Sequence, residues 1–134
     1  MATDPQFITT ARTATRKLVN ADGTSAATLL TIGATGGLVE GLFVTSNDTT
    51  SHNLTLLLGD GTTDVLIDTV SIPAAITGTP VQQVNLLNVY RWAWLDPNNL
   101  KWVLAAGRVL KIRMETAVSS GAFEVAVVAN YGEF

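Results

Sequence analysis

His52 is the only histidine in the chain and the side chain best suited to acid–base chemistry at neutral pH. Serines and aspartates stand close to it in the polar stretch 46–51, so a Ser-His-Asp arrangement would have to be built around it. No Gly-x-Ser-x-Gly motif accompanies it. One histidine also cannot form a multi-histidine metal site. We expect His52 to be a solvated loop residue and the chain not to be an enzyme, with no catalytic residue.

Three aspartates could bring carboxylates to a calcium ion: Asp60, Asp64 and Asp68. Their spacing misses the EF-hand pattern and its terminal glutamate. The pair Asp60-Gly61 is also a favoured hairpin turn, which explains Asp60 without a ligand. The glycines at 33–37 are not followed by the Lys-Ser or Lys-Thr pair of a phosphate loop. The sequence therefore predicts no metal and no cofactor.

An aromatic group is the more informative pattern. Tyr90, Trp92 and Trp94 stand at i, i+2 and i+4, which places them on one face of a strand. Such residues form a domain core, anchor a partner at an interface, or stack on sugars. We favour packing within the domain or between subunits over a sugar site, because the amides and carboxylates nearby at 96–99 already suit a turn.

A hairpin closed at 96–99 would place Trp94 opposite Lys101 and Trp92 opposite Val103, with Trp102 on the other face. The N-terminal segment 1–10 contains Pro5 and few alternating apolar residues, so we expect a contact arm. The residues we expect at interfaces are Phe7, Tyr90, Trp92, Trp94, Lys101 and Trp102.

Charged residues make up only 14% of the 134 residues, against about 25% in an ordinary soluble domain. Two explanations fit: a sandwich with a weakly charged surface, or a surface partly covered by neighbours, where charges would be desolvated. The net charge of −3 provides no basic footprint, so we expect no nucleic-acid partner. No segment reaches the roughly 18 apolar residues of a transmembrane helix, and we expect no membrane partner.

Short β-branched or leucine-rich runs, separated by turn residues, dominate the chain and indicate strands. The expected strands are 11–19, 26–32, 38–45, 53–58, 65–72, 81–95, 108–116 and 122–130. Strand 81–95 is too long to be regular, so we expect a bend or bulge in it. The pattern predicts an all-β fold, an antiparallel β-sandwich of about eight strands, jelly-roll-like, forming a single domain over 11–134.

Six segments, spread over nearly the whole chain, resemble small structural proteins of tailed bacteriophages. They are 7–15 (FITTARTAT), 20–24 (NADGT), 28–34 (TLLTIGA), 56–62 (LLLGDGT), 104–111 (LAAGRVLK) and 127–134 (VVANYGEF). The resemblance implies a jelly-roll cement or decoration protein, which binds the outer capsid surface and clamps neighbouring major capsid subunits. Where such relatives often carry Leu-Pro-x-Gly, this chain has Leu-Ala-Ala-Gly at 104–107.

The partners implied are the major capsid protein and the chain itself, as a homodimer or homotrimer. The location implied is the outer surface of the virion, after synthesis in the host cytoplasm. Two other functions also fit the sequence. One is a phage tail or baseplate adaptor or receptor-binding component, and the other is a carbohydrate-binding β-sandwich module.

Overall fold

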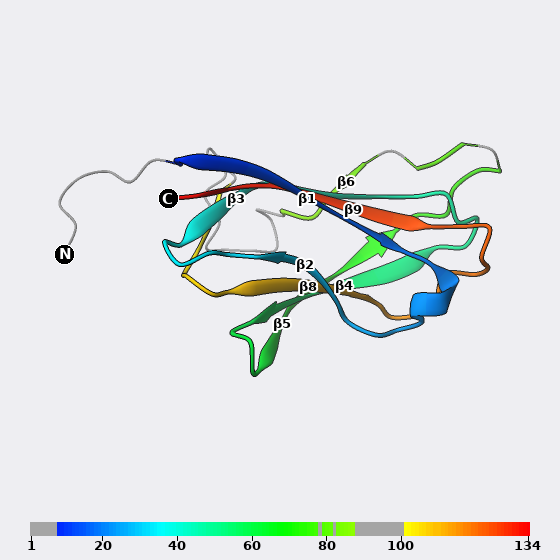
Figure 1. Cartoon of the computed structure of the whole chain (residues 1–134). Helices are drawn as coiled ribbons and strands as arrows, with labels where there is room; N and C mark the ends of the chain where they lie inside the picture. The colour runs from blue at the N-terminus through cyan, green and yellow to red at the C-terminus, as the bar shows by residue number, and fades with distance from the viewer. Residues whose placement is uncertain (1–7, 78, 82, 88–100) are drawn as a thin grey trace.

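The computed structural model describes residues 8–77, 79–81, 83–87 and 101–134 (Figure 1). The described residues form nine strands and a single 3-10 turn, η1 (Asn20–Asp22), so the all-β prediction is confirmed. The strands are β1 (Thr10–Leu18), β2 (Ala27–Thr31), β3 (Gly37–Ser46), β4 (His52–Gly59), β5 (Asp64–Ile72), β6 (Val84–Asn85), β7 (Trp102–Leu104), β8 (Val109–Met114) and β9 (Val125–Glu133).

The strands form two antiparallel sheets that pack face to face as a sandwich (Figure 1). Sheet A has the order β1-β9-β3-β6, with β7 also paired to β3, and sheet B has the order β2-β8-β4-β5. The first and last strands are neighbours in sheet A, and the second and second-last are neighbours in sheet B. This nesting is the jelly-roll topology, as the sequence predicted.

The edge strand beside β3 is divided in two. Asn85 of β6 lies opposite Phe43, and this register, if continued, would bring residue 89 opposite Val39. Trp102 of β7 stands there instead, so the chain has 13 residues more than one continuous strand would need. The chain between β6 and β7 is thus an insertion into one strand position of the jelly roll.

The predicted strand 81–95 is wrong in its described part, where only Val84–Asn85 are strand. Leu86 and Leu87 are both buried. In a strand with one face in solvent, successive side chains point to opposite faces, so these two residues cannot continue the strand. The side chain of Asn85 accepts a hydrogen bond from the Leu87 N–H at 3.0 Å and stabilises the turn away from the sheet. Residues 88–95 lie outside the described part of the chain.

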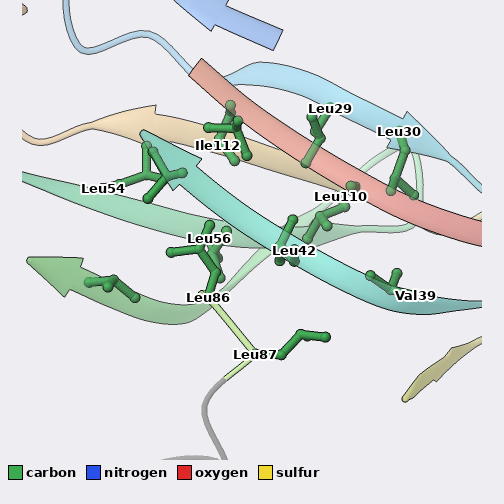
Figure 2. Packing of buried hydrophobic residues seen from close by; sticks show 14 of the residues in the cluster. Leu29, Leu30, Val39, Leu42, Leu54, Leu56, Leu86, Leu87, Leu110 and Ile112 are labelled. Atoms are coloured by element: carbon green, nitrogen blue, oxygen red, sulfur yellow. The ribbon is translucent and has the colours of Figure 1, made fainter. Parts of the chain in front are cut away.

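The core lies between the sheets and is built mainly from leucine, isoleucine and valine (Figure 2). On β8, Leu110, Ile112 and Met114 are buried while the residues between them are half-buried, as in a strand with one face in the core. Leu42 of β3 packs onto this row from sheet A, and Leu56 of β4 lies beside Ile112 within sheet B (Figure 2). Each strand thereby keeps a second face that points outward.

Candidate interaction surfaces

The outer face of sheet A carries mostly small side chains. The register of β1, β9 and β3 aligns them in rows across the sheet. The rows are Thr13–Asn130–Gly41, Thr15–Val128–Phe43 and Lys17–Ala126–Thr45, and Asn85 of β6 extends the middle one. We call these ten residues the sheet A face.

Charge is confined to the margins of the sheet A face. Lys17 pairs with Glu124 at 3.4 Å at one end, and Lys101 pairs with Glu40 at 3.7 Å at the other. Between these pairs, the rows of Thr13 and Thr15 carry hydroxyl, amide, methyl and phenyl groups and no ionisable group. A partner could therefore cover the middle of this face without desolvating a charge.

One end of the outer surface of sheet A is already covered. The Thr9 N–H donates to the Glu133 carbonyl at 2.9 Å, and Ile8 lies over Gly132. A Cβ on Gly132 would stand 2.5 Å from Cγ2 of Ile8, so only glycine lets this segment approach. The last residues of the predicted arm 1–10 thus lie against β9, while residues 1–7 are outside the described part.

The outer face of sheet B is chemically different, because it carries ion pairs. Lys111 binds Asp64 at 3.1 Å, and Arg113 binds Glu115 at 3.1 Å. Glu115 also accepts a hydrogen bond from Thr55, and the bonds from Thr55 and Arg113 lower the pKa of this carboxyl. Thr55 is fully buried beneath these groups.

The open edge of the sandwich has a groove of about 460 Å³ between the β4–β5 hairpin and the chain around β7. Its described walls are largely apolar, with Arg108 and Asp60 at the sides. Val65 is 58% exposed and Val103 is 66% exposed, which is unusual for side chains of this type. This edge therefore presents an apolar surface separate from the sheet A face.

Two of the six interface candidates from the sequence lie in the described part of the chain. Trp102 is 7% exposed and belongs to the core, opposite Val39 of β3. Lys101 is exposed at the margin of the sheet A face. The other four candidates, and the predicted hairpin at 96–99, lie outside the described residues: Phe7, Tyr90, Trp92 and Trp94. The place of the six at interfaces therefore stays a prediction.

The expectation that His52 is a solvated loop residue is wrong. His52 is 5% exposed, its Nε2 lies 2.7 Å from Oδ2 of Asp48, and its Nδ1 lies 2.9 Å from Oγ1 of Thr116. His52 is the first residue of β4 and stands in phase with Leu54 and Leu56, both fully buried. That two-residue phase is the sequence signal that could have placed it inside.

Asp48 is the centre of this buried network. Besides His52, its carboxylate accepts hydrogen bonds from the Ser119 N–H at 2.8 Å, the Ser119 hydroxyl at 2.9 Å and the Thr50 N–H at 2.9 Å. Burial would raise the pKa of Asp48, but these hydrogen bonds outweigh it and lower the pKa to about 2. The network ties the β3–β4 loop to the β8–β9 loop.

The order Thr116, His52, Asp48 resembles a hydroxyl–imidazole–carboxylate relay, but its surroundings are structural. The Asp48 carboxylate accepts hydrogen bonds from two backbone N–H groups and a second hydroxyl, and these bonds hold the two loops together. The groove at the open edge is lined by other residues. We therefore assign this network to stability.

The three aspartates considered for calcium have separate roles. Asp60 accepts the N–H groups of Thr62 and Thr63 at 2.9 Å, which lowers its pKa, and Asp64 pairs with Lys111. Asp68 is buried in β5. Among the described residues no group of three or more His, Cys, Asp or Glu could hold a metal. In that same part of the chain, no helix has the length and apolar character to cross a membrane.

No protein-family model and no curated protein matches the sequence. Among solved structures, the chain is similar to one in the cyanophage Pam1 capsid asymmetric unit, with 17% sequence identity and a TM-score of 0.49. The alignment covers 100% of this chain and 94% of that chain.

Proposed function

We propose that this chain is a non-enzymatic virion structural protein that binds the outer capsid surface and cements neighbouring major capsid subunits. The observation that carries the proposal is the sheet A face, where two complete rows across three strands hold no ionisable group. The likeness of six sequence segments to tailed-phage structural proteins supports the same function.

The sheet A face suits attachment to a shell for a physical reason. Hydroxyl and amide groups can form hydrogen bonds with a partner, and no charge has to be desolvated unpaired. The strands below are fixed by the core, so docking would order little additional chain. On a symmetric lattice each copy would repeat the same weak contacts, and their number would make the attachment firm.

The proposal includes a symmetric homo-oligomer, a dimer or a trimer, formed around the segment 89–103. In the described part of that segment, Val103 is 66% exposed beside the groove at the open edge. Val65 lines the same groove and is 58% exposed. An interface here would remove two large apolar side chains from water.

A matched pair of substitutions tests the attachment surface. Thr15→Glu places a carboxylate in the middle row of the sheet A face, and Thr28→Glu makes the same change at an exposed position of β2 in sheet B. We expect Thr15→Glu to lower occupancy on shells of the cognate capsid protein about tenfold or more, because the new charge would be buried. Thr28→Glu should bind like the wild type.

Occupancy is measured by sedimenting purified shells with each protein and quantifying the bound chain, after equal melting temperatures show that both variants fold. Equal occupancy of the two variants would contradict docking through sheet A. Absence of wild-type binding to the shells would contradict the proposed function as a whole.

A further inference from the structure

β1 is a free edge strand of unusual regularity. It pairs with β9 through nine consecutive residues, Thr10 to Leu18, with no break in register. Seven of these nine residues are exposed, Ala14 is half-buried and Leu18 is buried. In the described part of the chain β1 has β9 as its single neighbour, so its other side presents unpaired backbone N–H and C=O groups.

The charge on this edge is opposite in sign to that of the whole chain. β1 holds Arg12, Arg16 and Lys17 and no acidic residue, although the chain has only eight basic residues and a net charge of −3. Arg12 pairs with Glu133 at 3.0 Å, and Lys17 pairs with Glu124 at 3.4 Å. Arg16 has no carboxylate within ion-pair distance among the described residues.

Arg12 and Arg16 belong to the same side of the strand. Arg16 lies opposite Val127 in the register, and Ala14 and Leu18 on the same side lie opposite the buried Ala129 and Val125. The two arginines are four residues apart, about 13 Å along a strand. A strand added beside β1 would meet both guanidinium groups on one face.

This charge pattern disfavours a second copy of the chain as the added strand. Antiparallel self-pairing centred on Ala14 would place Arg12 of one copy opposite Arg16 of the other. Parallel self-pairing in register would place each of the three cations beside its own copy. The edge of sheet B differs, since β5 carries Asp64 and Asp68 and a bulge opposite Leu56 and Leu57.

We propose that the free edge of β1 accepts an extended acidic segment of the capsid partner as an additional antiparallel strand of sheet A. This inference rests on the proposed function and specifies the chemistry of its partner. The added strand gains main-chain hydrogen bonds from β1, and carboxylates four residues apart pair with Arg12 and Arg16. Uncharged or β-branched residues occupy the positions between them.

A peptide experiment tests the edge without shells. The probes are two peptides of the same length as β1, made of threonine and valine, one with two glutamates four residues apart and one with two lysines there. The protein is the full chain, and the readouts are amide exchange at β1 by NMR and titration calorimetry. We expect the acidic peptide to slow exchange in β1, and the lysine peptide to leave it unchanged.

Charge reversal then separates edge pairing from general electrostatics. Arg16→Glu should weaken binding of the acidic peptide about fivefold to tenfold, whereas Lys111→Glu, an equal change of charge on sheet B, should have little effect. Equal weakening by the two variants, or no protection of β1 by either peptide, would overturn the inference.

Shell binding distinguishes this inference from the function on which it rests. If the wild type binds shells and Arg16→Glu binds them equally well, the cement function stands and the acidic strand is wrong. If the wild type does not bind, the proposed function fails, and the peptide result alone decides whether the edge recognises acidic strands.

Discussion

The two outer faces of this sandwich lie over one shared core and differ in almost every chemical respect. Sheet B carries Lys111–Asp64 and Arg113–Glu115, with Thr55 buried beneath them. Sheet A carries threonine, asparagine, valine and alanine in the same kind of pleated position, with ion pairs only at its margins. Because the core requires only the inner face of each strand, the outer faces are free to diverge. The outer face of sheet B therefore holds paired charges, whereas the middle of the sheet A face holds none.

The largest effect should come from the network that holds the two sheets together at one end. Asp48→Ala leaves His52 and Ser119 without their buried partner, and we expect a loss of about 3 kcal/mol in the free energy of unfolding. Urea unfolding measures it. A loss below about 1 kcal/mol would show that the two faces are joined by the core alone.

The same residue predicts a dependence on pH with a defined sign. The folded-state pKa of Asp48, about 2, lies below the ordinary value of 3.8, so its contribution to stability is complete above about pH 5 and is lost as the pH falls through 3.8 towards 2. The difference between the two pKa values corresponds to about 2 kcal/mol in the free energy of unfolding. In Asp48→Asn this part of the pH dependence should vanish, and an unchanged acid slope would assign it to other carboxyls.

A smaller effect is expected where Ile8 covers sheet A. Gly132→Ala places a Cβ 2.5 Å from Cγ2 of Ile8, so the side chain must move, at a cost of about 1–2 kcal/mol. Ile8→Ala should be close to neutral in the Gly132→Ala background, because the clash is gone. Thermal melting of the four proteins of this double-mutant cycle gives the coupling, and its absence would show that Ile8 is not seated on β9.

The smallest effect belongs to the ion pairs of sheet B. Lys111→Met removes the pair with Asp64 at a partly exposed position, and we expect a change of less than about 0.5 kcal/mol that fades in high salt. A loss above 1 kcal/mol that persists in high salt would mean that sheet B, too, depends on its outer face for stability. Chemical denaturation of the wild type and the variant at two salt concentrations measures this change.

The strands and their nesting follow from local patterns, which explains why most of the fold was predictable. On β8 the alternation of Leu110, Ile112 and Met114 with charged residues fixes both the strand and its buried face. Loop residues are harder to place, because their environment is set by distant segments. Ser119 lies 71 residues from Asp48 in sequence, yet donates two hydrogen bonds to it.

The candidate site was less predictable for a related reason. The sequence draws attention to tryptophans, whereas the sheet A face consists of Thr15, Val128, Phe43 and similar residues from four strands that are distant in the chain. No local motif marks such a surface, since each row exists only after β1, β9 and β3 are paired. Trp102 shows the converse, because it stands out in the sequence but is buried in the core.

The edge strand beside β3 is divided, so the length of the chain between β6 and β7 does not determine the shape of the sandwich. β6 and β7 are each anchored on β3, so the segment between them can lengthen or shorten without moving any other strand. The length of the chain at this junction is thus independent of the registers that hold β6 and β7 on β3.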